Sequence, residues 1–68
     1  MLNSQEVHEL VVDARAAKNQ YLKALRLGKV SDIVAAAGAY HDKFDVLKVA
    51  TRWSINKLFD VINVGKEY

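Results

Sequence analysis

Residues 31–64 read SDIVAAAGAYHDKFDVLKVATRWSINKLFDVINV, with apolar residues recurring at intervals of three and four. That spacing matches the 3.6-residue turn of an α-helix and not the alternation of a β-strand. At about 100° per residue, one stripe gathers on one side of the helix. Its members are Ile33, Ala37, Tyr40, Phe44, Leu47, Thr51, Ile55, Leu58 and Ile62. The segment therefore predicts a long amphipathic helix over residues 32–64.

A second apolar stripe lies on another side of the same predicted helix. It consists of Ala35, Ala39, Val46, Ala50, Trp53, Val61 and Val64, with Val49 at its edge. A surface helix usually carries a single apolar stripe, directed at the core. One neighbouring helix covers only one of the two stripes, so the second indicates contact with a partner outside the chain's own fold.

The segment before Gly28 predicts a first helix over residues 4–27. Asn3 or Ser4 is a suitable N-cap, with Glu6 reaching back towards it. One apolar stripe follows, made of Val7, Leu10, Val11, Ala14, Ala17, Tyr21, Ala24 and Leu25. Residues 28–31 then form a short turn, and a connection this short makes the two helices antiparallel neighbours.

The expected fold is a single all-α domain over residues 1–68, an antiparallel helical hairpin with a long second helix. The first helix is about 36 Å long and the second about 50 Å at 1.5 Å per residue. The second helix must therefore extend past the first or fold back on it. An unbroken helix is favoured because the sequence holds no proline and no strong breaker lies between Thr51 and Ser54. The alternative is a three-helix bundle with a break near Thr51–Ser54.

The second stripe and the end of the long helix together predict a partner interface. Trp53 resembles an interface anchor, since tryptophan is enriched among the residues that dominate binding energy. A chain of 68 residues without cysteine also has no disulfide to stabilise a small core, which favours oligomerisation. We expect a dimeric four-helix bundle, or docking on another helical protein. The predicted interface residues are Val46, Val49, Ala50, Trp53, Leu58, Val61 and Ile62.

The sequence offers no pattern typical of catalysis, of cofactor binding or of a metal site. His8 and His41 are isolated from each other and from paired ligand spacings. No run of about 18 apolar residues predicts a membrane span, and the first residues lack the pattern of a signal peptide. We therefore expect a non-enzymatic, cytoplasmic interaction module. A minor subunit of a larger assembly, such as a phage particle, would use the same apolar surface.

A nucleic-acid-associated regulator is the alternative function. Four cations lie along one edge of the first helix and at the turn, namely Arg15, Lys18, Arg26 and Lys29. The net charge of +2 is too small to indicate nucleic-acid binding by itself.

Two strings resemble the Hha family, small partners of a nucleoid-structuring protein. WSINKLFDVI at residues 53–62 is similar to that family's final helix, and YLKALR at residues 21–26 is similar to its first helix. The strings are closer together here than in the family, and the first twenty residues have no counterpart. The resemblance implies a small regulatory protein that works beside a nucleic-acid-binding partner.

Overall fold

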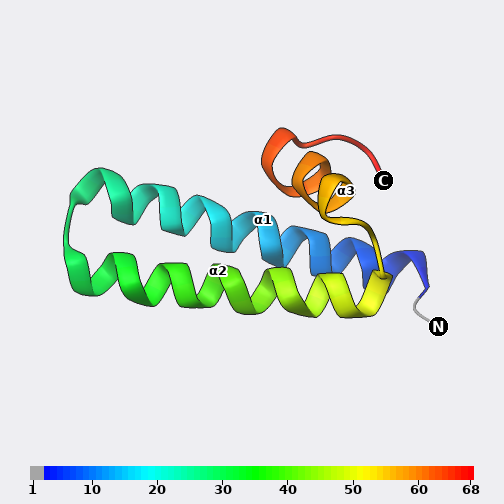
Figure 1. The fold of residues 1–68 in the computed structure, drawn as a ribbon, viewed down its shortest axis with the longest axis horizontal. Helices are drawn as coiled ribbons and strands as arrows, with labels where there is room; N and C mark the ends of the chain where they lie inside the picture. Colours follow the sequence, from blue (N-terminus) through cyan, green and yellow to red (C-terminus); the bar gives the residue numbers. More distant parts are fainter. Residues whose placement is uncertain (1–2) are drawn as a thin grey trace.

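The computed structural model describes residues 3–68, and every regular element in that range is helical (Figure 1). Helix α1 spans Ser4–Leu27 and helix α2 spans Val30–Thr51. A short helix α3 spans Ile55–Phe59 and continues directly into η1, a π-helical segment over Asp60–Val64. The predicted all-α class is confirmed. Residues 1 and 2 of the predicted 1–68 domain lie outside the described residues.

Local sequence signals set both ends of α1 where the sequence predicts them. The Asn3 side chain accepts a hydrogen bond from the Glu6 amide at 2.8 Å, which satisfies one amide of the first turn. Gly28 follows the helix with a φ of 74°, and its amide donates to the Ala24 carbonyl. A left-handed glycine at this position is a common helix terminator because it has no Cβ to clash.

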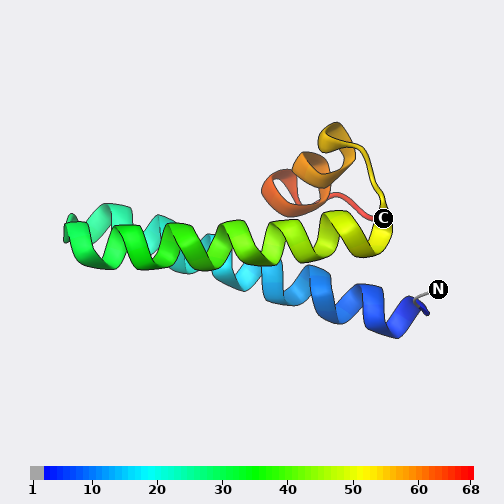
Figure 2. The same cartoon turned by 60° about the horizontal axis from the view of Figure 1, so that its bottom comes forward.

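The two long helices form an antiparallel hairpin, and the C-terminal helices fold back over half of it. Figures 1 and 2 show α3 and η1 lying over the half away from the Gly28 turn, while the half beside the turn stays a bare pair of helices. The start of α1 and the end of the chain lie at the same end, where the His8 ring is hydrogen-bonded to the Tyr68 hydroxyl. The molecule measures 39 by 19 by 19 Å.

The prediction of an unbroken helix over residues 32–64 is wrong, because α2 ends at Thr51. Arg52 takes a φ of 56°, in the left-handed region, and the chain reverses over residues 52–54. The Thr51 hydroxyl donates to the Leu47 carbonyl at 2.8 Å and accepts from the Trp53 amide at 3.2 Å. Ser54 then caps α3 by accepting from the Lys57 amide. The structure corresponds to the three-helix alternative.

Burial of the C-terminal residues explains why the chain breaks at a site without a strong breaker. A non-glycine residue in the left-handed region costs about 1–2 kcal/mol. Folding back reduces the exposure of Leu58, Val61 and Ile62 to 0%, 1% and 3%. Each such side chain contributes about 1.5–3 kcal/mol when it leaves water. Three of them together outweigh the strain at Arg52.

The hydrophobic core draws on every helix and lies in the half of the hairpin that α3 and η1 cover. Its fully buried members are Val11, Ala14, Leu47, Leu58, Val61 and Ile62. Near the turn, only Ala24 is buried. The core therefore stabilises one end of the molecule, and the end beside the turn depends on contacts between α1 and α2 alone.

Two cations of α1 bind the end of η1. Arg15 donates from Nε to the Val61 carbonyl at 3.1 Å and from a terminal nitrogen to the Lys66 carbonyl at 3.3 Å. Lys18 donates to the Asn63 carbonyl at 3.0 Å. The last carbonyls of a helix lack partners within the helix and carry partial negative charge. These cations therefore satisfy them and fix the C-terminal helices on α1.

Candidate functional site: two uncovered apolar surfaces

The first candidate surface is the outer face of α2, the side directed away from α1 and α3. We define it by the apolar and small residues that all lie exposed there, Ala35, Gly38, Ala39, Val46, Val49 and Ala50. Val46 and Val49 keep 49% and 76% of their surface exposed. Asp45, Val46, Val49 and Ala50 line a shallow hollow on this face. Apolar residues thus occur on both sides of α2, although residues 3–68 cover only one of them.

Small residues make the other half of the outer face flat. Gly38 has nothing within 4 Å of the position that a Cβ would take, and Ala35 and Ala39 are both exposed. A helix face of small residues allows another helix backbone to approach closely. The valines lie further along the same face. The outer face therefore carries small side chains near the start of α2 and larger ones near its end.

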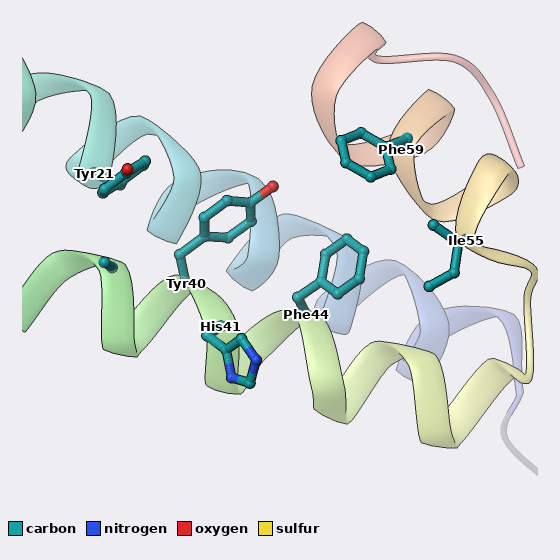
Figure 3. Close-up of a pocket in the computed structure, with 7 residues that line it drawn as sticks. Tyr21, Tyr40, His41, Phe44, Ile55 and Phe59 are labelled. Atoms are coloured by element: carbon teal, nitrogen blue, oxygen red, sulfur yellow. The ribbon is translucent and has the colours of Figure 1, made fainter.

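The second candidate surface is a groove of about 370 Å³ on the side where α3 and η1 fold back. We call it the aromatic groove and define it by its lining residues, Tyr21, Ala37, Tyr40, His41, Phe44, Ile55 and Phe59. Figure 3 shows Tyr40 and Phe44 rising from α2 towards α3, which supplies Ile55 and Phe59. Tyr21 comes from α1 and closes the end of the groove nearer the turn.

The aromatic rings of the groove form a continuous row. The ring centroids of Tyr21 and Tyr40 are 6.1 Å apart, those of Tyr40 and Phe44 also 6.1 Å, and those of Phe44 and Phe59 6.2 Å. The Tyr40 hydroxyl is occupied, because it donates to Asn63 Oδ1 at 3.3 Å. The groove therefore presents mainly carbon to any occupant, and Phe59 remains 53% exposed.

Six of the seven predicted interface residues fall into two groups. Val46, Val49 and Ala50 lie exposed on the outer face of α2. Leu58, Val61 and Ile62 lie in the chain's own core instead, since the fold-back of α3 and η1 buries them. Those three contact the chain's own helices and are not available to a partner in this fold.

Trp53 lies between the two groups. Its ring packs partly buried against the core, with the Tyr68 ring centroid at 5.6 Å and Lys57 Nζ at 4.6 Å from its own centroid. A cation over an indole face is a stabilising arrangement. Trp53 therefore covers one end of the core while part of its surface stays open to solvent.

The predicted basic edge is divided in a similar way. Arg15 and Lys18 are partly buried and donate to carbonyls at the end of η1. Arg26 and Lys29 are exposed beside the turn. The four cations therefore do not form one free phosphate-binding row, because only the pair near the turn is exposed.

The two histidines stand apart from each other. His41 lines the aromatic groove and pairs with Asp45 across 3.5 Å on the surface of α2, whereas His8 contacts Tyr68. In residues 3–68, no three histidine or acidic side chains gather as metal ligands would. None of the helices in that range is long and apolar enough to cross a bilayer.

Comparison with protein-family models, with curated proteins and with solved structures finds no match to this chain. The resemblance of residues 21–26 and 53–62 to the Hha family gains no support from these comparisons.

The aromatic groove was not predicted from the sequence. Tyr40, Phe44 and Ile55 belong to the first apolar stripe, whereas Phe59 belongs to neither stripe. Only the reversal at residues 52–54 brings Phe59 beside Phe44. The one sequence signal for it is the cluster of three rings on one side of the hairpin, Tyr21, Tyr40 and Phe44.

Proposed function

We propose that this chain is a non-enzymatic interaction module that self-associates as an antiparallel dimer through the outer face of α2. The observation that carries the proposal is the exposure of that face, where Val46 and Val49 keep 49% and 76% of their surface. A second copy is the proposed occupant because the face is complementary to itself. The pairing of two hairpins gives a four-helix arrangement.

Shape complementarity follows from the order of residues along the face. If two copies of α2 cross antiparallel about a twofold axis between Asp42 and Lys43, Val46 lies opposite Ala39 of the second copy. Ala50 then lies opposite Ala35, and Val49 lies near Gly38. The bulky half of each face thus packs against the small half of the other, which is the alternation that close packing needs.

The centre of this pairing carries charge. Asp42 and Lys43 are both exposed on α2 and lie about 100° apart around the helix, on opposite flanks of the interface. In an antiparallel pair related by a twofold axis, each flank faces the same flank of the other copy, so Asp42 lies nearest Asp42 and Lys43 nearest Lys43. Like charges across an interface weaken association, so the contacts of Val46 and Val49 with the small residues are what stabilise the dimer.

Small size supports self-association as well. The chain has 68 residues and no cysteine, and a core of this size is near the lower limit for independent stability. Covering the outer face of α2 removes exposed valine from water, at roughly 25 cal/mol per Å² of apolar surface. The dimer is therefore expected to be more resistant to unfolding at higher protein concentration.

Sedimentation velocity over a micromolar concentration series tests the proposal. Val49→Glu places a charge in the interface, and we expect it to shift the protein to the monomer. Val12→Glu is the matched control, since Val12 is 46% exposed on α1 and lies outside the interface. A wild-type protein that stays monomeric throughout the series would contradict the proposal, and so would equal sedimentation of the two variants.

Substitution of Asp42 tests the register. In this pairing the two Asp42 carboxylates approach each other at the twofold axis, so Asp42→Asn removes a repulsion and is expected to strengthen the dimer, more at low salt than at high salt. Asp13→Asn removes an exposed carboxylate of α1 outside the interface and is expected to leave the dimer unchanged. Equal effects of the two substitutions would exclude this pairing.

A further inference from the structure

The aromatic groove continues towards the turn as an uncovered apolar surface with a basic border. The structure leaves the half of the hairpin beside the turn without a third helix (Figure 1). Leu22 and Leu25 are 42% and 44% exposed there. Leu25 lies two heptads after Val11, which is buried in the covered half, so the two residues share one side of α1. The uncovered half thus continues the surface that α3 and η1 cover elsewhere.

The charge of this half is mainly positive. Residues 14–31 contain no carboxylate, and Asp32 follows in the first turn of α2. Arg15 and Lys18 are bound to carbonyls of the C-terminal segment, which leaves Lys23, Arg26 and Lys29 exposed near the turn. The whole chain, by contrast, has a net charge of only +2. Next to the groove, Lys48 follows Phe44 by one helical turn and is exposed on the same side of α2. On α2, Asp45 is paired with His41, while Asp42 is exposed beside the groove and Asp32 is exposed near the turn.

We infer that the aromatic groove and its extension towards the turn bind an amphipathic helix of another protein, with apolar anchors on one face and carboxylates beside them. An apolar groove between helices is the surface that such a helix recognises through side chains at i, i+3, i+4 and i+7. The bound helix takes the place of the missing third helix next to the turn. Acidic flanking residues then face Arg26 and Lys29.

The chemistry of the groove favours this occupant over others. Small-molecule sites combine an apolar lining with a few convergent polar groups; here the Tyr40 hydroxyl donates to Asn63, and His41 Nδ1 lies 3.5 Å from Asp45 on the surface of α2. A nucleic acid would use the cations but would leave the carbon-rich floor at Ala37 and Phe59 unused. A second copy is disfavoured because it would bring two basic turn regions together.

Binding of a defined peptide tests the inference. The probe is a fluorescein-labelled synthetic helix of about 14 residues, roughly four turns, with leucine along one face and glutamate at the flanking positions. The matched probe carries lysine in place of glutamate. Fluorescence anisotropy is expected to show binding of the glutamate peptide, weakening as salt is raised, and binding of the lysine peptide at least about tenfold weaker.

Variants of the protein locate the site. Ala37→Glu fills the groove floor with a charge and is expected to reduce binding at least about tenfold. Ala16→Glu is the control, since Ala16 is exposed on α1 outside the groove, and is expected to bind as the wild type does. If Ala37→Glu fails to fold by circular dichroism, Phe59→Ala, at a 53% exposed ring, gives the same comparison with the groove emptied.

The outcomes separate this site from the dimer interface. Binding is expected to persist in the Val49→Glu variant, whose substitution lies on the outer face of α2, so loss of self-association does not affect this result. Equal binding of the glutamate and lysine peptides would overturn the inference, as would wild-type affinity in Ala37→Glu or Phe59→Ala. If duplex DNA at physiological salt displaces the bound peptide, the surface would be assigned to nucleic acid instead.

Discussion

Arg52 is the residue on which the direction of the C-terminal helices depends. Its φ of 56° turns the chain out of α2, while its amide still donates to the Lys48 carbonyl at 2.9 Å. The neighbouring Thr51 hydroxyl completes the turn by bonding both Leu47 and Trp53. A long charged residue therefore occupies a backbone position that glycine fills at the ends of α1 and η1.

Replacing Arg52 with glycine is expected to stabilise the protein. Glycine adopts the left-handed region without the steric cost of about 1–2 kcal/mol, although it adds entropy to the unfolded chain. The expected net gain is about 0.5–1 kcal/mol in the free energy of unfolding, measured by urea denaturation. Arg52→Ala keeps the Cβ and is therefore expected to leave the free energy of unfolding without a gain. If Arg52→Ala stabilises the protein as much as Arg52→Gly does, backbone strain is not the cause.

Among the elements, α3 is the shortest and depends most on its cap. It has five residues, far fewer than an isolated helix needs for stability in water. Ser54 accepts from the Lys57 amide at 3.2 Å, and Leu58 donates its amide to the Ser54 carbonyl at 3.0 Å. By contrast, α2 begins after Lys29 without a side-chain cap.

Ser54→Ala is therefore expected to cost about 1 kcal/mol in the free energy of unfolding, because the Lys57 amide loses its acceptor. Ser31→Ala is the control at the uncapped start of α2 and is expected to cause no loss. Thermal and urea denaturation of the two variants provide the comparison. Equal losses from both would mean that the Ser54 cap does not stabilise α3.

At the scale of the whole molecule, one core joins all the helices. Leu58 is fully buried in a cluster that includes Val11 of α1, Leu47 of α2 and Val61 of η1. In a domain this small, the same few side chains support both the hairpin and the fold-back. Loss of one of them is therefore expected to weaken every helix and not α3 alone.

Leu58→Ala is expected to lower the free energy of unfolding by about 2–5 kcal/mol, the range for cavity-forming substitutions of buried leucine. Leu27→Ala, at a position 71% exposed, is the matched control and is expected to change it by less than about 0.5 kcal/mol. Urea denaturation followed by circular dichroism measures both. A two-step transition in Leu58→Ala, with the hairpin surviving, would show that the core is not shared.

The ends of α1 are determined by local signals and could be predicted from the sequence. The break at residues 52–54 depends on burial of the C-terminal helices and could not. Asn3 and Gly28 mark the ends of α1 by their own chemistry, and both act as expected. Nothing in Thr51, Arg52 or Ser54 by itself ends a helix. The break forms there because it lets the following residues reach the core, a gain that becomes visible only when the hairpin exists.

The same division applies to the candidate surfaces. Val46, Val49 and Ala50 were predicted to face outward because no helix of the chain was available for their side, and all three are exposed. Leu58 and Ile62 were assigned to a partner because an unbroken helix carries them beyond α1. The error in helix continuity therefore moved core residues into the predicted interface and hid the aromatic groove.

The start of α1 lies close to Tyr68, at the end of the molecule opposite the Gly28 turn. Asn3, Ser4 and Val7 border the same hollow as Trp53 and Tyr68. A short glycine-rich linker from Tyr68 to Asn3, with new ends opened between Gly28 and Lys29, gives a circularly permuted chain with the core contacts unchanged. In that permutant α2 would be synthesised before α1, so its refolding would show that complementary helix faces, and not their order, encode the architecture.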